Sequence, residues 1–288
     1  MVERRFLQGG MNRSIRCSPI ATPRGGLREL CLPYSSNRIV AAPPAPPQGP
    51  RARLGPALGP GLNRSFAWLK WYIHAVKTAE GKRKFLVGIA GGSGSGKTTL
   101  AKKVLESCLA AGITGQIFSL DNYYRPLEHL PFEGRKVYNF DHPHAIDFAL
   151  ALEHLKRLRA GKAIRQPVYD FKVYTRGGTR LQEATQVILV EGLYALYPPE
   201  LLALYDYKIF ISTGIATAVL RRMGRDITER GRDVDGSKHQ ILTAVLPMYE
   251  TYVKPTQRNA HFSINWDGEE IPEKATEGLV RMVRDYFR

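Results

Sequence analysis

The chain has 288 residues, of which 42 are Lys or Arg and 26 are Asp or Glu, so its formal net charge is +16. This length fits one large domain or two small ones, and the hydrophobic content of 43% is typical of a globular protein. No apolar run of about 18 residues occurs, so we expect no membrane-spanning helix. The three cysteines, Cys17, Cys31 and Cys108, form no C-x-x-C pair. We therefore expect neither a disulfide scaffold nor a zinc ribbon, and a reducing, cytoplasmic compartment fits best.

The first 80 residues differ from the rest in composition. They hold 12 Lys and Arg against three acidic residues, and ten of the 19 prolines lie before residue 61. Because no helical or strand period is sustained there, we predict a disordered, basic, Pro- and Arg-rich extension over 1–80, with one short helix over 66–77. Three interpretations stay open for this extension. It could be a basic arm that binds nucleic acid or an acidic surface, or an organelle transit peptide. It could also be a dispensable extension, or the result of a start site placed too far upstream, with Met11 as one of the internal alternatives.

From Lys84 onward, short β-rich runs alternate with amphipathic helical stretches. Strands are predicted over 85–90, 116–120, 186–190 and 207–212. Helices are predicted over 97–110, 145–160, 215–225, 237–252 and 273–287. This alternation predicts an α/β domain over 81–288, with a doubly wound, mainly parallel sheet and helices on both faces.

The run GGSGSGKT at 91–98 lies between the first predicted strand and the first predicted helix. It matches the complete G-x-x-x-x-G-K-[ST] phosphate-loop pattern in the expected context. Glycines let backbone N–H groups turn toward phosphate oxygens, Lys97 can reach the β- and γ-phosphates, and the Thr98 hydroxyl suits Mg²⁺. The loop therefore predicts a nucleoside triphosphate site, and the absence of an N-K-x-D motif argues against a GTPase switch. The residues expected to bind the nucleotide are Gly91, Gly92, Ser93, Gly94, Ser95, Gly96, Lys97, Thr98 and Thr99.

Acidic residues follow two of the predicted strands. Asp121 directly follows the run 116–120, and Glu191 directly follows the run 186–190. In an open parallel sheet, ligands bind at the carboxyl ends of the strands. Phosphoryl transfer to a hydroxyl needs a carboxylate that orients or deprotonates the acceptor, and oxygen ligands for Mg²⁺. The two carboxylates, placed opposite the phosphate loop, are predicted to provide both.

Five further motifs follow the phosphate loop in order: SLDNYY (119–124), NFDHPHAID (139–147), PVYDF (167–171), VEG (190–192) and RDITERGRD (225–233). Over roughly residues 84–265 they closely resemble the uridine kinase (uridine–cytidine kinase) family, within the phosphoribulokinase/uridine kinase group. The resemblance implies a P-loop kinase with an arginine-rich lid that transfers the γ-phosphoryl group of ATP to the 5′-hydroxyl of uridine or cytidine. It also implies a homotetramer with a small nucleoside substrate and no nucleic-acid partner for the kinase domain.

The resemblance further implies roles for single residues. Asp121 is the expected catalytic base, with Lys97, Arg225 and Arg230 as further catalytic residues. The expected Mg²⁺ site consists of Thr98, Asp121 and Glu191. The expected substrate residues are Asp141, which would bind the ribose 2′- and 3′-hydroxyls, together with Tyr124, Phe140, Tyr169, Phe171, Tyr174, Arg222, Arg232 and Gln240. The chemistry of these residue types agrees with the implied roles. A carboxylate can accept both hydrogens of a diol, aromatic rings stack on a pyrimidine, and arginines neutralise the charge of a transferring phosphoryl group.

Tyr174 departs from the resemblance, because the family usually carries there a His that reads the pyrimidine edge. Asn259 and His261 also stand where the family has Tyr and Asp. Other acceptors within the same group, such as nicotinamide riboside, ribulose 5-phosphate or pantothenate, are alternatives. A nucleotide-dependent switch or nucleic-acid binder is a rival of another class, but it would leave Asp121 and Asp141 without a purpose.

Overall fold

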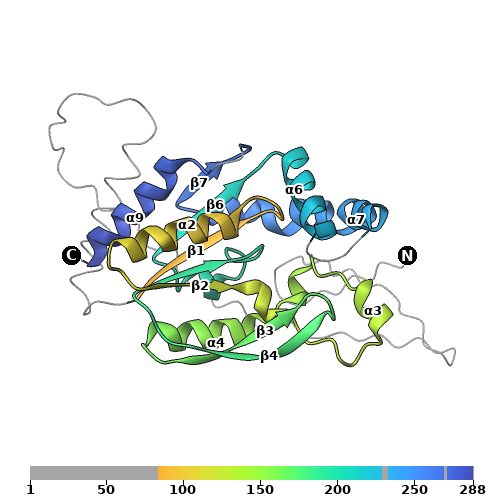
Figure 1. Ribbon diagram of the computed structural model, residues 1–288, viewed down its shortest axis with the longest axis horizontal. Coiled ribbons are helices and arrows are strands. Elements are labelled where there is room, and N and C mark those ends of the chain that lie inside the picture. Colours follow the sequence, from red (N-terminus) through yellow and green to blue (C-terminus); the bar gives the residue numbers. More distant parts are fainter. Residues whose placement is uncertain (1–83, 229–232, 269–270, 288) are drawn as a thin grey trace, which may run out of the picture. The chain divides into compact units, whose positions relative to one another are not determined.

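The computed structural model describes residues 84–228, 233–268 and 271–287 (Figure 1). The extension 1–80, the helix predicted over 66–77 and the predicted domain boundary lie outside the described residues. Within the described part of the chain, no helix is both long and apolar enough to cross a bilayer.

A five-stranded sheet forms the centre of the described residues, in the order β2-β5-β1-β6-β7, with every neighbouring pair parallel. Its strands are β1 (Phe85–Gly91), β2 (Gly115–Ser119), β5 (Val187–Glu191), β6 (Tyr207–Ser212) and β7 (Phe262–Asn265). All residues of β1 and β5 are buried, as continuous apolar runs in a parallel sheet require. The predicted parallel α/β sheet is therefore confirmed. Its last strand forms even though Asn259 and His261 precede it.

Helices cover both faces of this sheet (Figure 1). On one face, α2 (Lys97–Ala110) and α9 (Glu273–Phe287) pack on alternate strand residues such as Val87 and Leu189. On the other face, α4 (Phe148–Arg159) packs on the intervening residues, such as Leu86 and Ile188. The side-chain period of two along each strand thus divides the core into two layers.

A second, two-stranded sheet was not among the predicted strands. It is the antiparallel hairpin of β3 (Ile164–Asp170) and β4 (Thr175–Gln182). Most β4 side chains are exposed, so they lack the alternation of apolar and polar residues by which a strand is recognised. The hairpin matters for the site because Tyr169 and Tyr174 lie beside its turn.

The helix predicted over 237–252 is interrupted. The chain forms α7 (Val234–Gln240), a π-helical segment η3 (Ile241–Val245), the short α8 (Leu246–Met248) and a second π-helical segment η4 (Tyr249–Val253). Pro247 lies inside α8 and cannot donate a backbone hydrogen bond, which explains why the regular ladder is lost there. The remaining elements are η1 (Leu120–Tyr123), α3 (Phe132–Lys136), η2 (Pro143–Ala145), α5 (Pro199–Leu202), α6 (Ile215–Thr228) and η5 (Lys254–Asn259).

Strand register brings the predicted carboxylates to one edge of the sheet. Glu191 at the end of β5 is level with Ile89 of β1 and Ser119 of β2. After β2 the chain enters the 3₁₀ turn η1. The Ser119 hydroxyl caps this turn, because it accepts a hydrogen bond from the Asp121 N–H at 3.3 Å. Asp121 therefore lies just beyond β2, beside Glu191 and next to the phosphate loop that follows β1.

Candidate active site

The phosphate loop is shaped by glycines that no other residue could replace without strain. Gly94 has φ 77° and Gly96 has φ 89°. A Cβ atom on Gly96 would lie 1.7 Å from the Trp266 ring, and one on Gly94 would lie 2.3 Å from the Ala218 carbonyl oxygen. The loop is thus pressed between α6 and the segment after β7, and its backbone conformation is set by this packing.

Lys97 projects from the start of α2 and is almost fully buried. Its Nζ donates to the Gly92 carbonyl oxygen at 2.7 Å. Burial lowers the pKa of Lys97 to about 8, although the charges of Glu191 and Asp121 oppose this shift. The side chain therefore still carries its charge at pH 7, next to the loop that would hold the phosphates.

Two carboxylates face this lysine. Glu191 is 4% exposed, and its pKa is raised, first by burial and then by the negative charge of Asp121. The Thr98 hydroxyl lies 3.3 Å from Glu191 Oε2. Two acidic groups and a hydroxyl thus converge beside the Lys97 ammonium, and oxygen groups of this kind suit a divalent cation.

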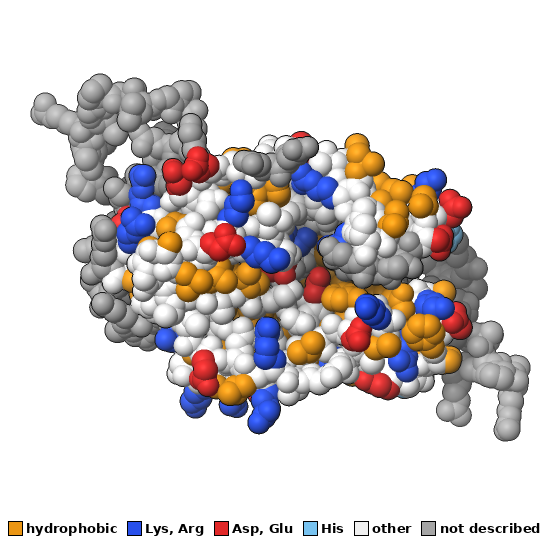
Figure 2. Space-filling view, in the orientation of Figure 1, with side chains coloured by type: hydrophobic (Ala, Val, Ile, Leu, Met, Phe, Trp, Pro, Cys, Tyr) orange, Lys and Arg blue, Asp and Glu red, His pale blue; other side chains and the backbone are white. Residues whose placement is uncertain are grey.

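A cavity of about 610 Å³ opens beside these carboxylates. Figure 2 shows a hollow on this face in which acidic side chains lie next to apolar ones. Five aromatic residues line it: Tyr124, Phe140, Tyr169, Phe171 and Tyr174. Between ring centroids, Tyr124 lies 5.2 Å from Tyr169 and 5.4 Å from Phe140, and Phe171 lies 5.1 Å from Tyr169. The Tyr169 hydroxyl is buried and has no hydrogen-bond partner among the described residues. These rings offer an aromatic wall to a planar ligand.

Asp141 also lines the cavity and is bound by an arginine from α6. Arg222 donates from Nη1 to Asp141 Oδ1 at 3.1 Å and from Nη2 to Asp141 Oδ2 at 3.3 Å. Its Nε lies 3.4 Å from Asp226 Oδ2, and its Nη2 lies 3.4 Å from Gln240 Oε1. Burial alone would lower the pKa of Arg222, but the charges of Asp141 and Asp226 outweigh it and raise the pKa.

Helix α6 also contacts the phosphate loop. Arg225 donates to the Ser93 hydroxyl at 3.0 Å, and Arg221 donates to the Gly94 carbonyl oxygen at 3.4 Å. Arg222 and Arg225 therefore connect the acceptor side of the cavity and the phosphate loop through one helix.

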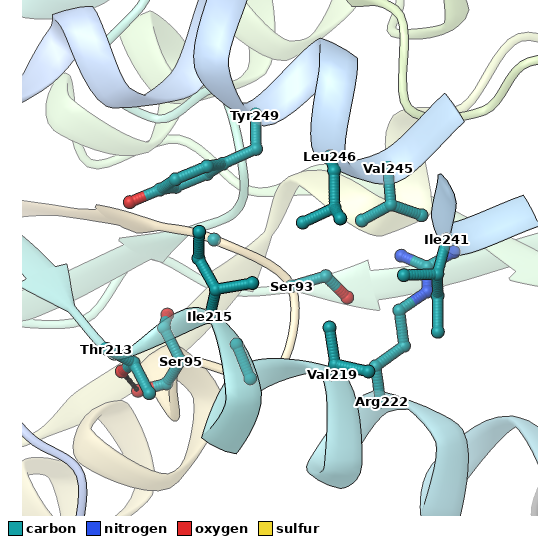
Figure 3. Close-up of a pocket in the computed structure, with 12 residues that line it drawn as sticks. Ser93, Ser95, Thr213, Ile215, Val219, Arg222, Ile241, Val245, Leu246 and Tyr249 are labelled. Carbon is teal, nitrogen blue, oxygen red and sulfur yellow. Dashed lines mark hydrogen bonds between the residues drawn. The ribbon is translucent and has the colours of Figure 1, made fainter. Parts of the chain in front are cut away.

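A second, apolar cavity of about 440 Å³ is lined in part by Gly92, Ser93 and Ser95 of this loop. In Figure 3, Val219 from α6 and Val245 and Leu246 from the helix opposite point into it, and the Tyr249 ring lies at one end. It shares Ser93 and Arg222 with the acceptor cavity.

Comparison with known proteins agrees with this geometry. The profile of the phosphoribulokinase/uridine kinase family matches residues 86–271. This chain belongs to that family. It is 41% identical over 192 residues to a uridine kinase of Clostridium novyi, covering 65% of this chain and 89% of the relative. It is 37% identical over 202 residues to a uridine kinase of Halobacterium salinarum, covering 70% of this chain and 85% of that protein.

A solved structure from Silicibacter sp. TM1040, named as a fructose transport system kinase, shares the P-loop kinase fold. Its TM-score is 0.54 at 19% identity, covering 68% of this chain and 98% of that one. As a member of the phosphoribulokinase/uridine kinase family, the protein is a kinase with a P-loop α/β fold.

Most of the site residues predicted for this family member line the acceptor cavity. They are Ser93, Lys97, Thr98, Asp121, Tyr124, Phe140, Asp141, Tyr169, Phe171, Tyr174, Glu191, Arg222, Arg225 and Gln240. Arg230 and Arg232 lie outside the described residues. Gly91 is the last residue of β1, Gly92 and Ser95 line the second cavity, and Gly94, Gly96 and Thr99 line neither cavity.

Sequence reasoning missed two contributors. Leu193, two residues after Glu191, adds an apolar contact to the cavity. Asp226 is fully buried beneath Arg222, and its position four residues further along α6 was a detectable signal, since such pairs face one another on a helix.

Proposed function

We propose that this kinase transfers the γ-phosphoryl group of ATP to the 5′-hydroxyl of a pyrimidine ribonucleoside, uridine or cytidine, and so yields UMP or CMP. The observation that carries the proposal is the single cavity that joins the phosphate loop to two acceptor-side carboxylates and a group of aromatic rings. A nucleotide switch has no use for such an acceptor pocket. The names of the relatives support the same substrate class.

The acceptor groups divide between sugar and base. Asp141 would accept hydrogen bonds from the ribose 2′- and 3′-hydroxyls, with Arg222 holding its two oxygens in place. Phe140, Tyr169 and Phe171 would pack on the pyrimidine, which is planar and stacks well on aromatic rings.

The transfer step needs a base and compensation for phosphate charge. Asp121 would accept the proton of the 5′-hydroxyl while the hydroxyl oxygen attacks the γ-phosphorus of ATP. At the same time, the bond between the γ-phosphorus and the bridging oxygen breaks, and this oxygen leaves with ADP. Lys97 and Arg225 would neutralise charge on the transferring group from two sides of the phosphate loop. Packing of α6 over this loop would help to exclude water, which otherwise competes as an acceptor.

The residues at the sheet edge fit a divalent cation. Glu191 is buried with a raised pKa beside the charge of Asp121, and the Thr98 hydroxyl adds a neutral oxygen. Thr98, Asp121 and Glu191 would hold Mg²⁺, which supplies positive charge to the β- and γ-phosphate oxygens when bound. A homotetramer and a cytoplasmic location remain predictions from the resemblance and the cysteine content.

Transfer of ³²P from γ-labelled ATP to a panel of acceptors tests the proposal. Uridine and cytidine should be labelled, and 5′-deoxyuridine should not be, because it lacks the attacking hydroxyl. 2′-Deoxyuridine should react poorly, because Asp141 loses one partner. Labelling of nicotinamide riboside, ribulose 5-phosphate or pantothenate in preference to both nucleosides would overturn the assignment.

Tyr174 bears on the choice of base. If its hydrogen is used elsewhere, its oxygen can only accept, which suits the cytosine amine and leaves uracil O4 facing a lone pair. Such a mismatch costs about 1–3 kcal/mol, or roughly 5- to 150-fold in discrimination. Cytidine is therefore expected to be used at least as well as uridine, and Tyr174→His should shift kcat/KM toward uridine. A wild-type preference for uridine, or a ratio that the substitution leaves unchanged, would refute this role.

A further inference from the structure

Tyr174 has an unusual backbone conformation. Its φ is 57°, and it is the one non-glycine residue with positive φ in the described ranges. The left-handed region crowds the Cβ atom against the backbone, so such residues persist only where their surroundings hold them, and they gather at functional sites. The ring of Tyr174 lines the acceptor cavity and stacks on Phe140, with centroids 5.7 Å apart and an interplanar angle of 20°.

One arginine outside the cavity holds the backbone next to Tyr174. Arg135 of α3 donates from Nη1 to the Val173 carbonyl oxygen at 3.3 Å. The same guanidinium donates from Nε to the Leu130 carbonyl oxygen at 2.9 Å and from Nη2 to the Glu128 carbonyl oxygen at 3.3 Å. It therefore joins the turn of the β3–β4 hairpin to the segment that leads into α3. Arg135 itself is not among the residues that line the acceptor cavity.

The contact with Val173 bears directly on the strained angle. The carbonyl of Val173 and the N–H of Tyr174 belong to one rigid peptide plane, and φ of Tyr174 measures rotation about the bond that follows that plane. An anchored carbonyl therefore keeps the plane from turning to a relaxed, negative φ. The planar fork of Arg135 can hold three carbonyls at once, which a single ammonium cannot do.

We propose that Arg135 is a positioning residue for nucleoside recognition. It fixes the Val173–Tyr174 peptide, keeps the Tyr174 ring parallel to Phe140, and so sets the side of the pocket that faces the base. This inference rests on the proposed function, because Tyr174 can read a base only if the acceptor is a nucleoside. It adds a residue that contacts neither ATP nor the acceptor.

Steady-state kinetics of Arg135→Ala test the proposal. The KM for cytidine and for uridine should each rise by about tenfold, as expected when a strained binding conformation is no longer held. The ratio of kcat/KM for cytidine to kcat/KM for uridine should move toward one, while the KM for ATP stays within about twofold of the wild-type value. Arg135→Lys should not restore the nucleoside KM. Arg125→Ala is the matched control, because Arg125 is exposed and its Nε donates to the His144 carbonyl oxygen at 3.1 Å, away from the turn.

A double-mutant cycle separates positioning from general stability. In a Tyr174→Ala background there is no ring to position, so Arg135→Ala should raise the nucleoside KM by less than about twofold. An unchanged nucleoside KM in the single variant, or an equal rise in both backgrounds, would overturn the inference. If Arg135→Ala lowers the melting temperature but leaves the nucleoside KM and the cytidine-to-uridine ratio of kcat/KM unchanged, Arg135 has a structural role only, and the inference is overturned. A wild-type enzyme that labels neither nucleoside would instead overturn the proposed function.

Discussion

Arg222→Met would remove the positive charge from a buried ionic group that spans the acceptor site. Arg222 and Asp141 are each 5% exposed, and Asp226 is fully buried. The substitution leaves the carboxylates of Asp141 and Asp226 without the positive charge of Arg222. The methionine side chain still fills much of the volume of the arginine's apolar stem. Electrostatics, and not loss of packing, should therefore dominate the result.

Removal of one partner from a buried ion pair typically costs about 3–5 kcal/mol. In a domain of about 200 residues, each kcal/mol lowers Tm by about 2–4 °C, so a decrease of about 6–20 °C is expected.

Thermal unfolding followed by circular dichroism, without substrate, measures this effect. Arg221→Met is the matched control: Arg221 is its neighbour in sequence, lies less deeply buried with its guanidinium 4.5 Å from the Trp266 ring centroid, and should cost about 1 kcal/mol or less. A Tm decrease in Arg222→Met no larger than in this control would refute the reasoning.

Other consequences can be checked separately. Asp121→Asn should lower kcat by about 10²-fold or more while ATP still raises the melting temperature, and near wild-type turnover would contradict its role as base. Gly96→Ala should abolish the ATP-dependent rise in Tm, whereas Gly161→Ala, also at positive φ but with nothing within 4 Å of its new Cβ, should only lower Tm slightly. Burial and the nearby Lys208 charge lower the pKa of His261 from 6.5 to about 4. The neutral imidazole therefore contributes fully to folding stability above pH 6.5, and this contribution is lost as the pH falls toward 4. In urea unfolding, the free energy of unfolding of His261→Asn should depend less steeply on pH than that of the wild type, and an unchanged slope would contradict this. A chain that starts at Glu80 should keep the Tm and activity of the full chain, and loss of either would show that the extension packs on the kinase domain.

The sequence by itself determined the elements whose signals are local. The apolar runs of β1 and β5 are buried on both faces, and such runs predict central strands of a parallel sheet. The phosphate-loop pattern needs only neighbouring residues, because its glycines and Lys97 act within one turn of chain. Asp121 and Glu191 could be placed opposite this loop from topology alone, since parallel strands end at a common edge.

Only the tertiary structure decided how distant polar groups pair and how the β3–β4 turn is held. The Arg222–Asp141 ion pair joins residues 81 positions apart, and no periodicity encodes such a pairing. The left-handed φ of Tyr174 conflicts with its local preference and persists through Arg135, which binds carbonyls from two separate segments. Local patterns report which face of an element is buried, whereas strained angles and ion pairs depend on what packing brings against them.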